Sequence, residues 1–193
     1  MEHLSTAALE RGLDHIRQSP LDVGRVDLIV RRPAVDEREV LAEGTLDLAE
    51  GLVGDTWRQR GSSSTSDGAA DPEAQLTVMN ARAAALFAVA PDRRQQSGDQ
   101  LYLDLDISLD NLPPGTRVQL GSAVIELSAK PHTGCKKFMA RFGKDALAFT
   151  GTPVGRELRL RGANARVVVP GVVRQGDPAR KLPVHATASR AGS

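Results

Sequence analysis

The sequence is poor in aromatic residues and contains a single cysteine, Cys135. Phenylalanine, tyrosine and tryptophan together make up 3% of its 193 residues, so a core must be filled by leucine, valine, isoleucine and alanine. One cysteine excludes a disulfide framework within the chain, which favours a reducing compartment. The formal net charge is only +1, and this excludes a strong overall attraction to nucleic acid or to a membrane surface.

Long apolar runs are also missing. The longest, residues 83–90, is far shorter than the roughly 20 residues that span a bilayer. The first residues lack the basic start and apolar run of a signal peptide. The balance of 40% apolar and 25% charged residues is that of a globular domain. We therefore expect a cytoplasmic protein that binds neither nucleic acid nor a membrane.

Several common functional motifs are absent. No Gly-x-Gly-x-x-Gly sequence opens a helix after a strand, and there is no Walker-type phosphate loop and no serine hydrolase elbow. A zinc site is poorly supported, because one cysteine accompanies only four dispersed histidines: His3, His15, His132 and His185.

Short strands separated by Gly, Pro and Asp turns dominate what is present. The strand-like segments are 26–30, 38–48 (with a break at Gly44-Thr45), 74–79, 101–107, 117–120, 123–129, 158–161, 165–169 and 172–173. Residues 101–107 alternate as a half-buried strand should, and Gly121-Ser122 is typical of a tight hairpin. The pattern favours a mainly β fold, a barrel or closed sandwich with a few short helices, over a βαβ fold.

Helical patterns are fewer, and they help to divide the chain. They cover residues 5–17, 81–88 after the capping residue Asn80, and 144–149, with Asp145 as a possible cap. We expect an N-terminal helical extension at 1–23, a β domain at 24–181 and a loose tail at 182–193. The Gly/Ser-rich stretch 60–71 is predicted to be a flexible loop.

The stretch 130–143 surrounds the cysteine and is the first candidate site. Cys135, Phe138, Met139 and Phe142 follow the spacing i, i+3, i+4, i+7, which predicts a short helix with the cysteine in its first turn and three core residues. Gly143 stands where a C-terminal cap belongs.

Cations surround Cys135 in sequence: Lys136, Lys137 and Arg141. Positive charge stabilises a thiolate, which can act as a nucleophile, a sulfur carrier or a soft-metal ligand. The alternative is that Cys135 is a small buried hydrophobic residue beside Phe138, as many free cysteines are.

Two other polar signals are weaker. The adjacent Arg93 and Arg94 have planar forks suited to phosphate or carboxylate, although such pairs are also common on solvated loops. Asp55 ends the sequence Gly51-Leu-Val-Gly-Asp55, in which the carboxylate can organise a loop or simply support an ordinary turn.

One ordered set of short motifs runs from about residue 24 to residue 177. The set comprises Gly24-Arg-Val, Gly51-Leu-Val-Gly-Asp55, Arg93-Arg94, Gly98-Asp-Gln-Leu101, Leu112-Pro-Pro-Gly115 with Gly121, Pro131-His-Thr-Gly-Cys135-Lys-Lys-Phe138, Arg161-Gly162 and Gly171-Val-Val-Arg-Gln-Gly-Asp177. This order resembles the MOSC domain family, named for the C-terminal domain of molybdenum cofactor sulfurase. Gln95 stands where many relatives have asparagine. Where many relatives have Pro-Cys, this chain has Gly134-Cys135, and this Thr-Gly-Cys form suggests a bacterial stand-alone type.

The resemblance implies a MOSC-like β-barrel that binds the molybdenum cofactor (molybdopterin). It implies that Cys135 carries sulfur or binds the molybdenum. The anionic cofactor phosphate would be held by basic side chains through charge-assisted hydrogen bonds. The candidate cofactor contacts are Arg93, Arg94, Lys136, Lys137, Arg141 and Asp55, the last more typical of a turn support. His132 would orient or deprotonate Cys135, or hydrogen-bond within its turn.

Three functions follow from this resemblance. The first is cofactor binding with sulfur transfer through Cys135 as a persulfide. The second is molybdenum-cofactor-dependent reduction of N-hydroxylated compounds with an external electron donor, because the chain has no flavin, haem or iron–sulfur motif. The third is a non-catalytic cofactor carrier or chaperone. The chain has no room for a pyridoxal phosphate-dependent desulfurase domain, so the expected partner is a separate cysteine desulfurase, reductase or molybdoenzyme.

Overall fold

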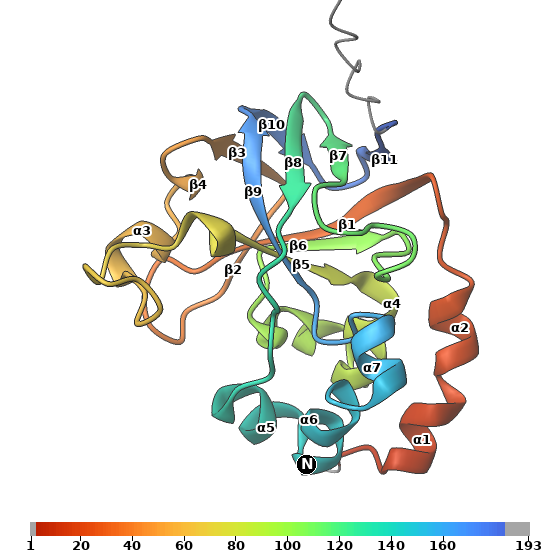
Figure 1. Ribbon diagram of the computed structural model, residues 1–193. Helices are drawn as coiled ribbons and strands as arrows, with labels where there is room; N and C mark the ends of the chain where they lie inside the picture. The colour runs from red at the N-terminus through yellow and green to blue at the C-terminus, as the bar shows by residue number, and fades with distance from the viewer. Residues whose placement is uncertain (1–2, 184–193) are drawn as a thin grey trace, which may run out of the picture.

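A closed barrel of seven strands forms the centre of the computed structural model, which describes residues 3–183 (Figure 1). The order around the barrel is β1, β11, β7, β8, β9, β5 and β6, which pairs again with β1. Their bounds are β1 Val23–Arg31, β5 Leu76–Asn80, β6 Leu101–Asp104, β7 Arg117–Leu120, β8 Ala123–Leu127, β9 Ala163–Val169 and β11 Pro178–Lys181. β5 and β6 are parallel and the other neighbours antiparallel, so the predicted mainly β, barrel fold is confirmed.

Four shorter strands extend the barrel. β2 (Glu39–Leu41) pairs with the end of β1. β3 (Glu43–Asp47), β4 (Gly51–Leu52) and β10 (Gly171–Arg174) form a separate sheet in the order β10-β3-β4. Gly44 and Thr45 lie inside β3, so the predicted break there is wrong. A Cβ on Gly44 would come within 2.8 Å of the Leu52 side chain, so glycine there allows close packing.

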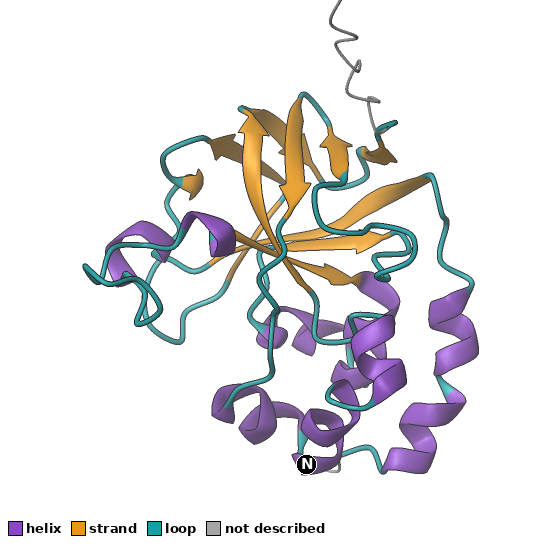
Figure 2. Ribbon diagram, viewed as in Figure 1, coloured by secondary structure: helices purple, strands orange, loops and turns teal. Residues whose placement is uncertain are grey.

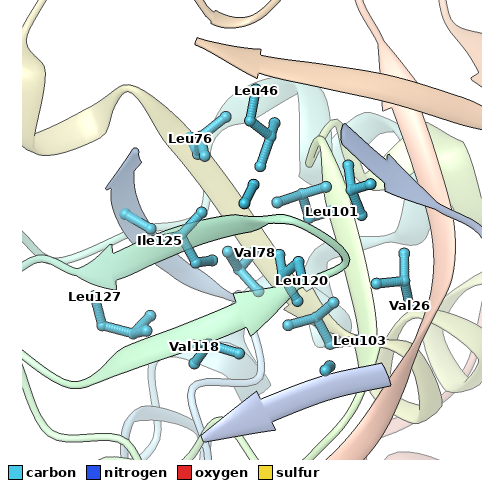
Figure 3. Packing of buried hydrophobic residues seen from close by; sticks show 14 of the residues in the cluster. Val26, Leu46, Leu76, Val78, Leu101, Leu103, Val118, Leu120, Ile125 and Leu127 are labelled. Atoms are coloured by element: carbon cyan, nitrogen blue, oxygen red, sulfur yellow. The ribbon is translucent and has the colours of Figure 1, made fainter. Parts of the chain in front are cut away.

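Aliphatic side chains fill the barrel, as the shortage of aromatic residues requires. Figure 3 shows leucine, isoleucine and valine side chains from many strands meeting in one cluster. Those labelled are Val26, Leu46, Leu76, Val78, Leu101, Leu103, Val118, Leu120, Ile125 and Leu127.

The four phenylalanines pack elsewhere, in a second cluster between the barrel and the helices. Phe87, Phe138, Phe142 and Phe149 meet Tyr102 and Met79, which come from strands of the barrel. β6 is therefore covered on both faces: Leu101, Tyr102 and Leu103 are all buried. The prediction of a half-buried strand over 101–107 is wrong in this respect, because helices cover the outer face.

The helices gather on one side of the barrel, apart from α3 (Figure 2). They are α1 Thr6–Arg11, α2 Leu13–Arg17, α3 Trp57–Arg60, α4 Ala81–Ala88, α5 Lys136–Phe142, α6 Lys144–Thr150 and α7 Pro153–Glu157, with 3₁₀ turns η1 Pro72–Ala74 and η2 Pro91–Ser97. Within residues 3–183, none of these helices has the length and apolar character needed to cross a bilayer.

Local sequence signals predicted where the helices lie more accurately than where each helix begins and ends. The Asn80 side chain accepts hydrogen bonds from two backbone N–H groups and caps α4 as predicted. The predicted helix over 5–17 is interrupted at Gly12, between α1 and α2. Residues 158–161 are not a strand but the turns that follow α7. α6 begins after Gly143, and Asp145 lies inside it rather than at its cap.

Three predicted peripheral segments are the N-terminal helices, the Gly/Ser-rich loop and the C-terminal tail. α1 and α2 bury Leu9, Leu13 and Ile16 against the second cluster. Within the loop, Ser64 bonds Ser62 and Asp71. Its flexibility stays a prediction, and most of the tail predicted to be loose, residues 184–193, lies outside the described residues.

Candidate functional site

A pocket of about 480 Å³ lies where the loop after β8 reaches α5. Its walls come from both the barrel and the helical side, and Cys135 is among them. Seven cationic side chains line it: Arg32, Arg38, Arg60, Lys130, Lys137, Arg141 and Arg161. Asp36 is the one carboxylate in the lining that the described residues provide, so the pocket is suited to an anion.

Cys135 lies on the surface at the beginning of α5. Its extended backbone (φ −127°, ψ 170°) makes it the N-cap residue, one position before the predicted first turn, and its side chain makes no capping hydrogen bond. The thiol is exposed, so the alternative of a small buried hydrophobic residue is wrong. Phe138 and Phe142 are buried as predicted, whereas Met139 is 40% exposed. The helix thus anchors its apolar face and leaves Cys135 accessible to the pocket.

Arg32 follows β1 and is held by Asp55. The Asp55 carboxylate accepts hydrogen bonds from Arg32 Nε and Nη2, both at 2.8 Å, and from the Arg32 backbone N–H at 3.0 Å. It also accepts one from the backbone N–H of Trp57 at 2.9 Å. Asp55 is buried and does not line the pocket. It organises the loop, as one interpretation of its motif predicts, and fixes the guanidinium that lines the wall.

Arg161 and His132 also line the pocket, and both lie close to Asp99. Asp99 accepts from Arg161 Nη1 at 2.9 and 3.2 Å, the backbone carbonyl of Ser97 accepts from Nη2, and the guanidinium lies 4.9 Å from the centre of the Phe138 ring. Arg161 Nε is buried without a hydrogen-bond partner among the described residues. The sequence analysis placed Arg161 in the Arg161-Gly162 motif but did not predict it as a site residue.

His132 is a neutral side chain at physiological pH. Burial, reinforced by the positive charge of Arg161, lowers its pKa to about 4, against the opposing effect of Asp99. Its Nδ1 lies 3.4 Å from Asp99 Oδ1 but makes no hydrogen bond. Among the described residues none links His132 to Cys135. An imidazole with this pKa is a weak base, so the structure favours a wall residue over a base for the thiol.

Lys137 and Arg141 lie on the same face of α5 and hold Asp36. Asp36 Oδ1 accepts from Lys137 Nζ at 2.8 Å and from Arg141 Nη2 at 3.1 Å. The hydrogen bond from Lys137 lowers the pKa of Asp36. Arg141 Nη1 also donates to the backbone carbonyl of Gln96 at 2.8 Å. These contacts join the loop after β1 to α5 and place both predicted cations in the pocket wall.

Arg38 and Arg60 complete the wall and were not predicted. Neither forms an ion pair with a carboxylate within residues 3–183. Arg38 Nε is buried and has no hydrogen-bond partner in the described part of the chain. Burial and the nearby charges of Arg141 and Arg32 lower the pKa of Arg38. Within the described residues no ion pair neutralises Arg38 or Arg60, and Asp36 and Asp55 act on them only from a distance.

Besides Asp55, three further predicted cofactor contacts lie outside the pocket lining: Arg93, Arg94 and Lys136. Arg93 Nη2 donates to the backbone carbonyl of Arg141 at 2.6 Å, and its guanidinium lies 5.6 Å from the centre of the Phe142 ring. Arg94 pairs with Asp27. Both arginines thus make structural contacts within the chain, and Lys136 is exposed. Within residues 3–183, no cluster of three or more His, Cys, Asp or Glu side chains has the arrangement of a metal site.

Fold and site together define a MOSC-like β-barrel protein with a cationic pocket beside one exposed cysteine. The structure is similar to that of YuaD from Bacillus subtilis, with a TM-score of 0.57 and 15% identity over 81% of this chain and 94% of that chain. It is also similar to YiiM from Escherichia coli, with a TM-score of 0.54 and 19% identity over 83% and 70%. No family profile and no curated protein matches the sequence. At these identities the similarity shows the fold.

Proposed function

We propose that the chain is a MOSC-family protein that binds the molybdenum cofactor in the pocket beside Cys135 and carries sulfur on that cysteine. The observation that carries the proposal is an accessible thiol in the wall of a pocket with seven cations and one carboxylate. When bound, the cofactor supplies a dithiolene-held metal, for which thiolate sulfur is a suitable soft ligand, and an anionic phosphate.

The residues present fit such a group. Arg38 and Arg60 carry positive charge that no carboxylate pairs with in the described part of the chain, and the Nε groups of Arg38 and Arg161 are buried donors without acceptors. A buried donor that lacks an acceptor costs free energy, and a phosphate oxygen would satisfy it. We therefore assign the phosphate contacts to Arg38, Arg60 and Arg161, with Lys137 and Arg141 at the rim. Arg93 and Arg94 make structural contacts with the Arg141 backbone carbonyl and with Asp27, respectively.

Cys135 does the chemistry that this chain supplies. Its thiolate attacks the terminal sulfur of a persulfide on a donor protein, a new S–S bond forms, the donor's S–S bond breaks, and the donor leaves as a thiolate. Cys135 then holds the sulfur as a persulfide at the pocket. The donor is a separate cysteine desulfurase, and the reaction takes place in the cytoplasm.

Purification of the chain and its Cys135→Ala variant from a molybdenum-replete host tests the proposal. We expect wild-type protein to contain pterin and molybdenum and to take up labelled sulfur from a desulfurase. Cys135→Ala should keep the pterin, because the arginines remain, but lose the labelled sulfur. Ser66→Ala, in the exposed loop, is the control and should behave as wild type.

The other outcomes separate the two alternative functions from the proposal. Loss of both pterin and metal in Cys135→Ala would indicate metal ligation, as in a cofactor-dependent reductase of N-hydroxylated compounds. Bound cofactor that passes unchanged to a molybdoenzyme, with no effect of Cys135→Ala, would indicate a carrier. Absence of pterin from the wild-type protein would overturn cofactor binding.

A further inference from the structure

A second cavity of about 430 Å³ lies beside the cationic pocket. The loop segment 130–133, together with Arg161 and Asn164, lines both cavities and forms their common wall. A volume of this size is within the range of small-molecule binding sites in proteins. Nothing in the proposed function uses it.

The walls of the second cavity are mainly apolar. Leucine, proline, alanine and glycine residues form most of the surface, with Leu109 near solvent at 43% exposure and Leu147 and Ala163 more deeply buried. No carboxylate is present among the described residues that line it. The body of a fitting ligand is therefore apolar and the cavity has no group to neutralise a bound amine.

Four cations line this mainly apolar wall, of which Lys130 pairs with Asp71, Arg156 is exposed and Arg161 is held by Asp99. The fourth, Arg159, is partly buried. Its Nη1 donates to the backbone carbonyls of Leu112 at 2.6 Å and Ile107 at 3.3 Å, and it has no carboxylate partner within residues 3–183. Burial lowers the pKa of its guanidinium. Its backbone has φ +48°, a conformation unusual for a residue with a side chain and often kept at functional positions.

Arg161 lies in the wall that the second cavity shares with the cationic pocket. Its side chain is only 8% exposed, yet Nε has no hydrogen-bond partner among the described residues. Asp99 occupies Nη1 and the Ser97 carbonyl occupies Nη2. The Nε donor is assigned above to the cofactor phosphate, so the charge left for a ligand of the second cavity is that of Arg159, which has no carboxylate partner among the described residues.

We infer that the second cavity binds a small monocarboxylic acid with an apolar body, whose carboxylate meets Arg159. The apolar walls take the hydrocarbon part, and the guanidinium receives the charge through a charge-assisted hydrogen bond. This site is separate from the cofactor pocket, so it does not rest on the proposed function.

Titration calorimetry with 3-phenylpropionate tests this inference, because the compound joins an apolar ring to one carboxylate. Its neutral analogue, 3-phenylpropionamide, has the same shape without the charge. We expect saturable binding of the acid and at least about tenfold weaker binding of the amide. Cys135→Ala should bind the acid as wild type does, which separates this site from the thiol.

Substitutions at the mouth of the cavity locate the binding. Leu109→Glu places a carboxylate at a partly exposed position and should weaken binding of the acid at least about tenfold. Leu109→Gln, similar in size but uncharged, should retain most of the affinity. Val169→Glu is a matched control, because Val169 is 46% exposed and does not line the cavity. Circular dichroism verifies that all three variants are folded.

Three results would overturn the inference. The first is the absence of saturable binding of the acid at millimolar concentration. The second is equal affinity for the acid and the amide, which would exclude recognition of the charge. The third is equal weakening by Leu109→Glu and Val169→Glu, which would place the binding elsewhere.

Discussion

At the residue scale, the pocket contains two kinds of cation. Arg32 and Arg161 are buried and each is held by a buried carboxylate, Asp55 and Asp99 respectively. A buried charge is stable only when it is paired and hydrogen-bonded, so these pairs fix the position of the guanidinium groups. Arg38, by contrast, has no carboxylate partner in the described chain. The first kind builds the wall and leaves only the Nε of Arg161 for a ligand, whereas the second kind leaves its charge for a ligand.

His132 gives the fold a specific dependence on pH. Its pKa is about 4 in the folded protein and about 6.5 in an unfolded chain, so the unfolded state takes up the proton first as the pH falls. We expect the free energy of unfolding to include a His132 contribution that is constant above about pH 6.5. Between about pH 6.5 and 4 this contribution should fall, by at most about 1.4 kcal/mol per pH unit.

Urea unfolding of the wild type and of His132→Gln over this range measures the contribution. The unfolding free energy of the wild type minus that of His132→Gln should decrease steadily as the pH falls, because glutamine does not titrate. The other acidic and basic groups are common to both proteins and cancel in the comparison. A difference that is the same at every pH would contradict a depressed histidine pKa.

At the element scale, α5 illustrates how local sequence signals determine a structure. The apolar spacing after Cys135 and the glycine at position 143 predicted a short helix and its end, and both are present. Gly143 has φ +95° and ψ 165°, a backbone region essentially restricted to glycine. It ends α5 and begins α6 in one step.

Gly143→Ala should therefore lower the free energy of unfolding by about 1–3 kcal/mol. A Cβ there would also lie 2.9 Å from the His3 side chain, which must move. Gly151→Ala is the matched control: Gly151 ends α6 with an ordinary helical φ of −88°, and alanine there should be neutral or slightly stabilising. Chemical unfolding of both variants provides the measurement. An equal effect of the two substitutions would show that the backbone conformation at 143 is unimportant.

Elements that depend on distant parts of the chain were harder to predict. The alternation in 101–107 correctly indicated a strand, but its burial on both faces depends on helices that pack over it. Residues 158–161 have strand propensity, yet they form turns because α7 precedes them and the chain must enter β9. Tertiary packing overrides propensity in both places.

At the scale of the whole molecule, the site was predictable only where it is local. Cys135, Lys137 and Arg141 lie within seven residues of one another; the sequence pattern named all three as candidates, and all three line the pocket. Arg38 and Arg60 come from two loops that no periodic pattern connects, and the folded barrel brings them to the same pocket. The adjacent Arg93 and Arg94 were also predicted to contact the cofactor, but they make contacts within the protein instead.

Because no ion pair neutralises Arg38 or Arg60 in the described chain, the thermal stability of the protein should depend on the anions in solution. A ligand that binds only the folded state raises its stability by mass action, so inorganic phosphate should raise the thermal midpoint above that in chloride at equal ionic strength. Arg38→Gln should lose most of this increase. In chloride the same variant should be as stable as the wild type or more so, because an unpartnered buried Nε and its repulsion with Arg141 and Arg32 are removed.

Arg174→Gln, at a surface arginine paired with Glu43 outside the pocket, should respond to phosphate as the wild type does. An undiminished response of Arg38→Gln would show that phosphate acts elsewhere on the molecule.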